Sequence, residues 1–173
     1  MHAAALIIVG LALSNAPAAQ QKDPRISRVE NEVRHELLML PYYGVFDLLT
    51  FRVEPGGTVR LMGATPRPTL KSDAERRVKG IAGVEQVINE IEVLPASPAD
   101  DRIRLAIARN IYRTEALERY GFQTNPSIHI IVKSGRVTLE GVVDTEGDKT
   151  IAGMKAREVG GTFEVTNNLR VER

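Results

Sequence analysis

In the second half of the chain, basic and aromatic side chains accompany the apolar stripe of Ile103, Ile107 and Ile111, and together they could bind a charged partner. The basic and aromatic residues are Arg102, Arg104, Arg109, Arg113, Tyr112 and Tyr120. An amphipathic helix of this kind binds anionic headgroups when its guanidinium groups contact phosphate and its aromatic rings lie at the membrane interface. We therefore expect them to contact anionic phospholipid. The alternative is an ordinary helix whose apolar face packs in the core.

A second group of aromatic side chains lies in residues 41–46, in a chain that is only 5% aromatic. Tyr42, Tyr43 and Phe46 follow a proline and surround a glycine, which is typical of a loop. This loop is a candidate contact surface for an envelope protein or for another domain of the same chain. Packing in the core is the alternative.

The residue types needed for metal and covalent chemistry are missing or scattered. The chain has no cysteine, and His2, His35 and His129 show no metal-ligand spacing. There is no G-x-S-x-G motif, and Asp100 and Asp101 fall in the first turn of a predicted helix, where carboxylates interact with the helix dipole. We expect no metal, no cofactor and no enzymatic activity. His35 is predicted to lie on a helix surface and His129 on the outer face of a sheet.

Basic and acidic side chains are nearly balanced. The 23 lysines and arginines and the 22 acidic residues give a formal net charge of +1 at pH 7. Such a chain has no overall field that would concentrate nucleic acid, and we expect no nucleic-acid partner. Electrostatic binding must therefore be local.

The first residues have the pattern of an export signal. Residues 3–13 form an apolar run too short to span a bilayer, and Ala16, Pro17 and Ala18 have the small-x-small pattern of a cleavage site. We predict a cleavable signal peptide over residues 1–18 and a periplasmic or otherwise extracytoplasmic location. The alternative is a buried N-terminal helix, although Gly10 disfavours it.

Comparison of the chain with itself shows one internal repeat. The matched pairs, each separated by 78 positions, are Gly57 and Gly135, Val59 and Val137, Leu61 and Leu139, Gly63 and Gly141, Gly83 and Gly161, Val87 and Val165, Asn89 and Asn167, and Val93 and Val171. Upstream of these pairs, apolar alternation aligns Phe51 with Ile130, a separation of 79. The first hairpin loop is therefore predicted to be one residue longer than the second.

Each repeat is predicted to form a helix, two strands, a helix and a strand. Asp23-Pro24 and Ser97-Pro98 resemble an N-cap followed by proline at the first helical position. Thr65-Pro66 and Asp144-Thr145 are expected to open the second helices. Glycine turns between the first two strands favour hairpins.

The predicted fold class is α+β, with two small α-β-β-α-β domains. Each domain should be a three-stranded sheet with two helices packed on one face, because a sheet with one apolar face needs a cover. The expected boundaries are residues 23–94 for the first domain, 95–99 for a linker and 100–173 for the second domain. The last strands are expected to be continuous over 87–94 and 163–171.

Six residues of the repeat are interpreted as structural. They are Gly63, Gly83, Asn89, Gly141, Gly161 and Asn167. The first glycine of each repeat ends a strand, and the second follows a helix, where a left-handed residue is common. Asparagine is a poor strand former, so its side chain is expected to bond a neighbouring backbone group.

These motifs resemble the BON domain. The pattern V-x-L-x-G, a later glycine, and V-x-N-x-[IL]-x-V occurs over residues 59–93 and again over 137–171. The resemblance implies an α-β-β-α-β fold, attachment to phospholipid or envelope partners and no catalytic residues, as in osmotically inducible periplasmic proteins with tandem BON domains. The chain departs from the family at Gly161-Thr162, where Gly-Val is usual, and it has no cysteine for lipid attachment.

The expected function is that of a non-enzymatic periplasmic protein that binds anionic phospholipid or another envelope component through its BON-like modules. The alternative is a protein-interaction scaffold, or a chaperone-like stabiliser of envelope proteins, that does not bind lipid directly.

Overall fold

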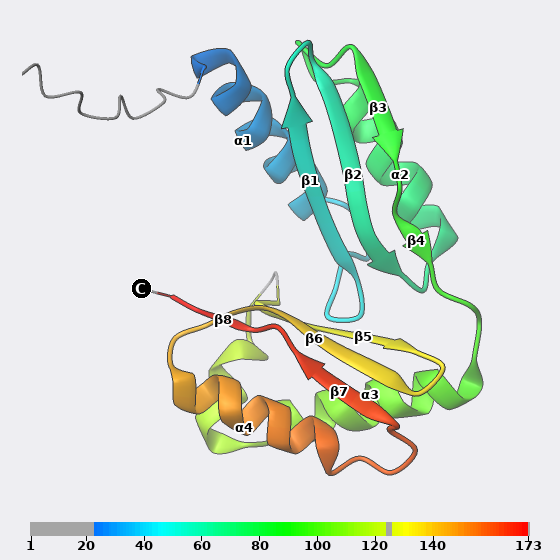
Figure 1. Ribbon diagram of the computed structural model, residues 1–173, viewed down its shortest axis with the longest axis vertical. Coiled ribbons are helices and arrows are strands. Elements are labelled where there is room, and N and C mark those ends of the chain that lie inside the picture. The colour runs from blue at the N-terminus through cyan, green and yellow to red at the C-terminus, as the bar shows by residue number, and fades with distance from the viewer. Residues whose placement is uncertain (1–22, 124–125, 173) are drawn as a thin grey trace, which may run out of the picture.

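The structure is a computed structural model that describes residues 23–123 and 126–172, so the predicted signal peptide lies outside the described residues. It consists of two α+β domains, and in each domain two helices pack on one face of a small sheet (Figure 1). This arrangement confirms the predicted fold class and the duplication.

The first domain begins with a capped helix. The Asp23 side chain accepts a hydrogen bond from the Arg25 backbone N–H at 2.8 Å, and Pro24 takes the first helical position, where no N–H is needed. The elements of this domain are α1 (Pro24–Leu38), β1 (Leu48–Glu54), β2 (Thr58–Thr65), α2 (Pro68–Lys79), β3 (Gln86–Asn89) and β4 (Glu92–Val93).

The second domain begins in the same way. The Ser97 hydroxyl accepts a hydrogen bond from the Asp100 N–H at 3.2 Å. The elements are α3 (Pro98–Tyr112), η1 (Glu115–Tyr120), β5 (Ile128–Lys133), β6 (Arg136–Val143), α4 (Glu146–Arg157), β7 (Glu164–Asn167) and β8 (Arg170–Val171). Because α3 begins at Pro98, residues 98–99 of the expected linker belong to this helix.

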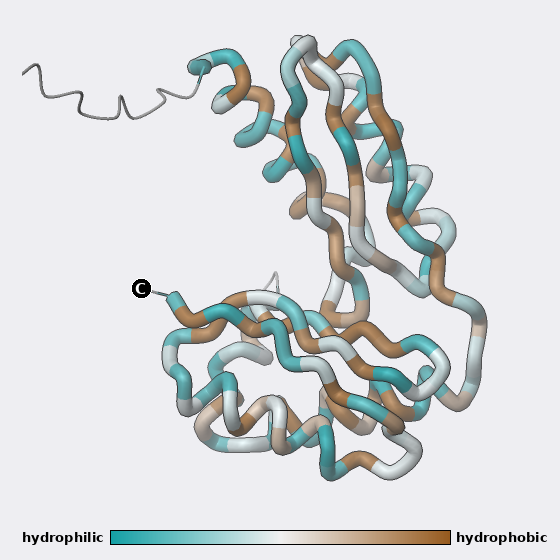
Figure 2. Tube along the Cα trace, in the orientation of Figure 1, coloured by the Kyte–Doolittle hydropathy of each residue, from teal (hydrophilic) through white to brown (hydrophobic). Residues whose placement is uncertain are grey.

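Each sheet combines an antiparallel hairpin with a parallel third strand. The strand order is β1-β2-β3 in the first domain and β5-β6-β7 in the second, and β4 and β8 pair with β2 and β6. β1 and β5 are therefore edge strands. Hydrophobic and hydrophilic residues alternate along the strands in Figure 2, as expected when one face is buried.

The hairpin registers explain the one-residue shift between the repeats. Phe51 pairs with Leu61 in the first domain, and Ile130 pairs with Leu139 in the second. The first hairpin turn is one residue longer than the second. The predicted shift is confirmed, and it keeps the apolar residues of both edge strands on the core face.

Each domain has its own hydrophobic core. Val33, Leu61 and Leu70 are at most 1% exposed in the first core, and Ile107 and Leu139 are fully buried in the second. The two groups of buried residues are separate clusters. The duplication has therefore produced two folding units rather than one merged core.

The second helix of the first domain starts later than the sequence indicates. Thr65-Pro66 is the expected start, but Thr65 still belongs to β2, where it pairs with Val93. The Thr65 hydroxyl donates to Asp47 at 2.6 Å and accepts from the Arg67 N–H at 3.0 Å. These bonds hold Thr65 in the strand, so α2 begins only at Pro68.

The last strand of each domain is interrupted, which corrects the predicted continuous strands. The Asn89 side-chain oxygen accepts a hydrogen bond from the Ile91 N–H at 3.2 Å, and Asn167 accepts one from Leu169 at 3.3 Å. A side chain that bonds the backbone two residues later competes with the strand ladder. β3 and β7 therefore end at these asparagines.

The connection from the first helix to the first strand differs between the domains. It spans residues 39–47 in the first domain and 113–127 in the second. The longer connection contains η1, which sequence analysis missed because such a short helix has too few turns to show a periodic pattern. Leu117 and Tyr120 of η1 are buried in the second core.

The shorter connection, residues 39–47, belongs to the first domain and packs against the second. Val45 and Phe46 pack against the second core, and the Ile130 N–H donates to the Val45 carbonyl at 2.7 Å. The Tyr43 hydroxyl lies 3.4 Å from Nε2 of His129. His129 lies between core residues of β5 and points to the other face, but the connection covers it, leaving it 8% exposed.

Candidate functional site

One side of α3 carries three of the arginines that the sequence singles out. Ile103, Ile107 and Ile111 are buried, so the helical period turns the opposite side to solvent. The exposed residues there, which we call the arginine face, are Arg102, Leu105, Arg109 and Arg113.

The guanidinium groups of the arginine face have no carboxylate partners in residues 23–123 and 126–172. Arg109 Nε donates to the Leu105 carbonyl at 3.2 Å, and no ion pair with another described residue reaches Arg102, Arg109 or Arg113. Leu105 lies between them and is 52% exposed. The arginine face is therefore a locally basic surface with one exposed apolar side chain.

A shallow hollow of about 800 Å³ adjoins the arginine face. Arg102 and Arg109 line one side, and Phe163, which is 83% exposed, lines another. Phe163, which the sequence predicts in the last strand, lies before β7 and over Gly135, where an added Cβ atom would lie 2.5 Å from its ring. No apolar pattern in the sequence reveals this exposed ring.

Two other residues of the predicted lipid-binding pattern point into the domain. Arg104 is 2% exposed, and its Nη2 donates to the Val132 carbonyl at 2.8 Å. The Tyr112 hydroxyl donates to the Ile128 carbonyl at 3.1 Å, and burial raises the pKa of Tyr112 to about 12. These two side chains bind the edge strand β5.

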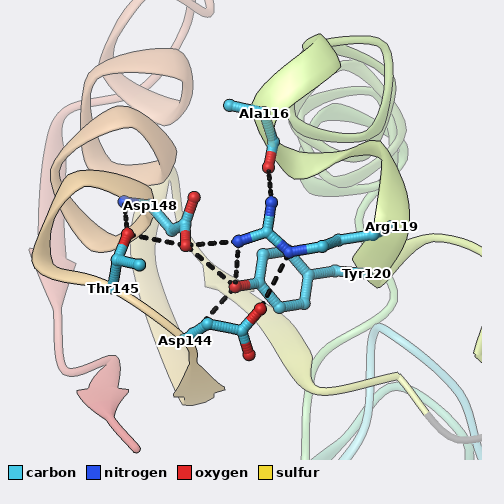
Figure 3. A network of polar contacts seen from close by, with 6 residues as sticks. All are labelled: Ala116, Arg119, Tyr120, Asp144, Thr145 and Asp148. Carbon is cyan, nitrogen blue, oxygen red and sulfur yellow. Dashed lines mark hydrogen bonds and ion pairs between the residues drawn. The ribbon is translucent and has the colours of Figure 1, made fainter.

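Tyr120 is only 2% exposed, which corrects its predicted place at a membrane interface. Its hydroxyl donates to Asp148 at 3.0 Å and accepts from the Asp144 N–H at 2.8 Å, while Arg119 donates to Asp148 at 2.6 Å (Figure 3). Burial alone would raise the pKa of Asp148, but hydrogen bonds from Thr145 and Tyr120 and the charge of Arg119 hold it below its ordinary value. The network ties η1 to the start of α4.

A second buried carboxylate ties the first domain together. Asp47 is fully buried and accepts hydrogen bonds from the Thr65 hydroxyl at 2.6 Å, Arg67 Nη1 at 2.7 Å and the Gly44 N–H at 3.0 Å. These bonds fix residues 39–47 against the start of α2. They thereby hold Val45 where it meets β5.

The aromatic loop, residues 41–46, lies mostly between the two domains. Tyr43 and Phe46 are half-buried in the domain contact, so they are not free for a partner, whereas Tyr42 is 82% exposed. Burial raises the pKa of Tyr43 to about 12 and lowers the pKa of His129. Tyr43 packs against the first core and Phe46 against the second, so the structure supports both core packing and contact with the other domain.

Gly63 and Gly141 lie where the paired strands approach too closely for a side chain. Their φ angles are 116° and 124°, and a Cβ atom would lie 2.0 Å from the Leu48 carbonyl oxygen in the first domain and 1.9 Å from that of Ser127 in the second. Only glycine fits both the backbone angle and the space.

The repeated asparagines join the last strand of each domain to its second helix. Asn89 Nδ2 donates to the Lys71 carbonyl at 2.9 Å, and Asn167 Nδ2 donates to the Lys149 carbonyl at 2.7 Å. The two glycines that follow the second helices, Gly83 and Gly161, have φ angles of 95° and 89°. These contacts give the repeated motif residues structural roles.

The described residues contain no group of three or more His, Cys, Asp or Glu side chains that could hold a metal ion. His35 is exposed on α1, and His129 is buried in the domain contact. None of the described helices is both long and apolar enough to cross a membrane.

Comparison with known proteins matches the BON domain twice, to residues 27–95 and to residues 104–173. A search of curated proteins found no match. Among solved structures, the C-terminal domain of CdsD, a structural protein of the type III secretion system of Chlamydia trachomatis, is 13% identical, covers 83% of this chain and 96% of its own, and has a TM-score of 0.32. A second CdsD structure, at the same identity and TM-score, covers 84% of this chain and 92% of its own. These scores carry no argument about function, but the two domain matches together span most of the sequence, and the chain is therefore a member of the BON-domain family with two BON domains in tandem.

Proposed function

We propose that this tandem BON protein is a non-enzymatic binding protein of the bacterial periplasm that contacts anionic phospholipid through the arginine face. One observation carries the proposal: three arginines without ion-pair partners in the described chain surround the exposed Leu105. A nearer relation to the osmotically inducible periplasmic protein Y belongs to the same proposal.

The arginine face has the chemistry that a phospholipid surface requires. Each guanidinium group donates several hydrogen bonds to phosphate, and a basic residue near an anionic surface contributes about 1 kcal/mol. Leu105 and Phe163 add exposed apolar groups that fit the boundary between headgroups and acyl chains. The hollow between Arg102 and Phe163 offers space for a headgroup.

Vesicle flotation tests this contact with the full chain. We expect the protein to float with vesicles of phosphatidylcholine and phosphatidylglycerol but not with phosphatidylcholine alone, and binding should weaken as salt is added. The double variant Arg109→Glu/Arg113→Glu should reduce binding at least about tenfold, because two favourable charges become repulsive.

The matched control is Arg52→Glu/Arg170→Glu. Both residues are exposed on sheet strands, have no ion pair with another described residue and give the same change in net charge. An equal loss in the control would mean that overall charge, not the arginine face, drives binding. Salt-independent binding to neutral vesicles would contradict the headgroup mechanism.

Export is a separate part of the proposal. N-terminal sequencing of the protein purified from a periplasmic fraction should find Ala19 or Gln20 as the first residue. A chain that keeps residues 1–18 and stays in the cytoplasm would contradict it.

The alternative function is that of a scaffold or chaperone-like stabiliser of envelope proteins. Two features support it: Tyr42 is exposed, and the backbone groups of Phe51 and Val53 on the edge strand β1 have no hydrogen bond from outside the sheet in the described residues. Recovery of one envelope protein in fixed ratio with the full chain, without lipid dependence, would favour this alternative.

A further inference from the structure

The edge strand of the second sheet, β5, exchanges hydrogen bonds with residues outside the sheet. The Ile128 carbonyl accepts from Tyr112, the Ile130 N–H donates to Val45, and the Val132 carbonyl accepts from Arg104. An antiparallel edge strand directs the N–H and C=O groups of alternate residues away from its partner. These three residues of β5 are the alternate, outward set, and each has one of its two outward backbone groups bonded.

The corresponding edge of the first sheet is open. Since Phe51 and Val53 correspond to Ile130 and Val132, the same alternation turns their N–H and C=O groups outward. No hydrogen bond from another described residue reaches these outward groups. At Leu49 the edge lies next to the Tyr43 hydroxyl, whose pKa is raised by burial, a rise that the Leu49 backbone opposes.

The difference follows from two helix positions. Pro24 of α1 corresponds to Pro98 of α3, so the counterparts of Arg104 and Tyr112 are Glu30 and Leu38. A carboxylate and an alkyl side chain cannot donate to a carbonyl. The first domain therefore lacks both donors that close the second edge.

A cleft of about 680 Å³ runs beside the open edge. Leu49 and Phe51 line it from β1, Leu37 and Arg34 line it from α1, and Arg170 lines it from the second domain. The two arginines have no ion pair with another described residue, although the Arg34 guanidinium lies over the Phe51 ring at 5.8 Å. Glu30 and Glu140 also line the cleft, so its arginines are local cations and not a uniformly positive surface. The cleft combines free backbone groups, apolar side chains and, over the Phe51 ring, the Arg34 cation.

The chain itself shows what such an edge accepts. Val45 and Phe46, held by the buried Asp47, present a carbonyl to Ile130 and apolar side chains to the second domain. Ala108 of α3 packs in the same cluster as Val45 and Phe46, and the residue of α1 at the corresponding position is Arg34. An extended segment with an acidic residue would find the same backbone donor at Phe51 and a cation at Arg34.

We propose that the edge of β1, residues 49–53, binds an extended segment of a partner protein that carries two apolar residues followed by a carboxylate. The segment adds a strand to the first sheet, with its backbone paired to Phe51 and Val53 and its carboxylate at Arg34. No residue of the arginine face lines the cleft, so the site works independently of that face.

The test uses a synthetic peptide with the sequence of residues 41–48 and the full chain labelled with ¹⁵N. Titration should shift the backbone amide signals of Phe51 and Val53. The double variant Glu30→Arg/Leu38→Tyr, which supplies the two missing donors, should weaken binding at least about tenfold while the protein stays folded. The same peptide with lysine in place of aspartate should also bind more weakly.

The matched control is Glu32→Arg/Met39→Tyr, which makes the same chemical changes at exposed positions of the α1 region outside the cleft. It should bind the peptide like the natural chain. Peptide shifts confined to Ile130 and its neighbours, or no shift at all, would overturn the proposal. Self-association of the chain without peptide would also overturn the proposal if Glu30→Arg/Leu38→Tyr abolished it. The occupant of the edge would then be a second copy of the chain.

Discussion

The two domains hold their second helices with the same kind of ion pair, but the charges are exchanged. In the first domain the connection supplies the buried carboxylate, Asp47, and the helix start supplies Arg67. In the second domain the connection supplies Arg119 and the helix supplies the buried carboxylate, Asp148. Both domains therefore have this tie, although the residue types at its two ends are exchanged.

The edge strands of the two sheets, β1 and β5, differ in another way. Both pair with their neighbours in the same register, but they differ in the hydrogen bonds that reach them from outside the sheet. Tyr112, Arg104 and Val45 bond the edge of β5, whereas no hydrogen bond from outside the sheet reaches Phe51 or Val53 of β1 in the described residues. An uncapped edge strand is a template for pairing with another chain. The first domain therefore keeps a backbone surface that the second domain has closed.

The largest effect should come from Gly63 and Gly141, the glycines at equivalent positions of the two domains. Gly63→Ala and Gly141→Ala should each cost about 4 kcal/mol or more, because the new Cβ would overlap a carbonyl oxygen at a positive φ. Urea unfolding followed by circular dichroism should show that each variant unfolds its own domain. A mild loss of stability at only one of the two positions would contradict the equivalence of Gly63 and Gly141.

The exchanged ion pairs should have similar but smaller effects. Asp47→Ala and Asp148→Ala should each cost about 3 kcal/mol, because each leaves several donors unpaired. Only Asp47→Ala should also shift the amide signal of Ile130, because it releases the segment that holds Val45. An identical change at Ile130 in both variants would contradict the assignment of the domain contact to residues 39–47.

Removing the Tyr112 hydroxyl oxygen removes one of the hydrogen bonds that hold the edge of β5. Tyr112→Phe should cost about 1 kcal/mol, because the Ile128 carbonyl loses its donor while the ring remains. Denaturant unfolding of the second domain measures this loss. Leu38→Phe is the matched control at the corresponding helix position, and a loss of equal size there would show that the hydroxyl is not responsible.

The smallest effect is a dependence of domain docking on pH. Burial lowers the pKa of His129 below 6.5, and the backbone of Gly44 and Asp47 and the charges of Asp47 and Glu140 oppose the shift. The docked state favours the neutral ring, so docking is strongest above pH 6.5 and weakens as pH falls from 6.5 toward the lower folded pKa. Titration of the Ile130 amide signal should show this weakening, and His129→Gln should remove it.

Much of the fold could be predicted because the repeat doubles every local signal. Alternation in β1 and β5 predicted the one-residue register shift, and the apolar stripes of α1 and α3 predicted both cores. The breaks after Asn89 and Asn167 could not be located, because a side chain that competes with the strand ladder leaves the apolar alternation intact.

The candidate site was less predictable, because helical spacing alone does not say which residues are buried. Arg104 and Tyr112 have the residue types of a lipid-binding surface but serve β5, and Tyr120 belongs to the Asp148 network. Phe163 was missed because its exposure depends on where β7 begins. Arg102, Arg109 and Arg113 stay a prediction for vesicle binding.

Amide hydrogen exchange at the two edge strands tests the central contrast most directly. In the full chain, the N–H of Ile130 is bonded to Val45 and its counterpart at Phe51 is open. We predict that the Phe51 amide exchanges faster than the Ile130 amide by on the order of 100-fold or more, while amides that pair with β2 and β6 are equally protected. Equal protection at Phe51 and Ile130 would contradict the account.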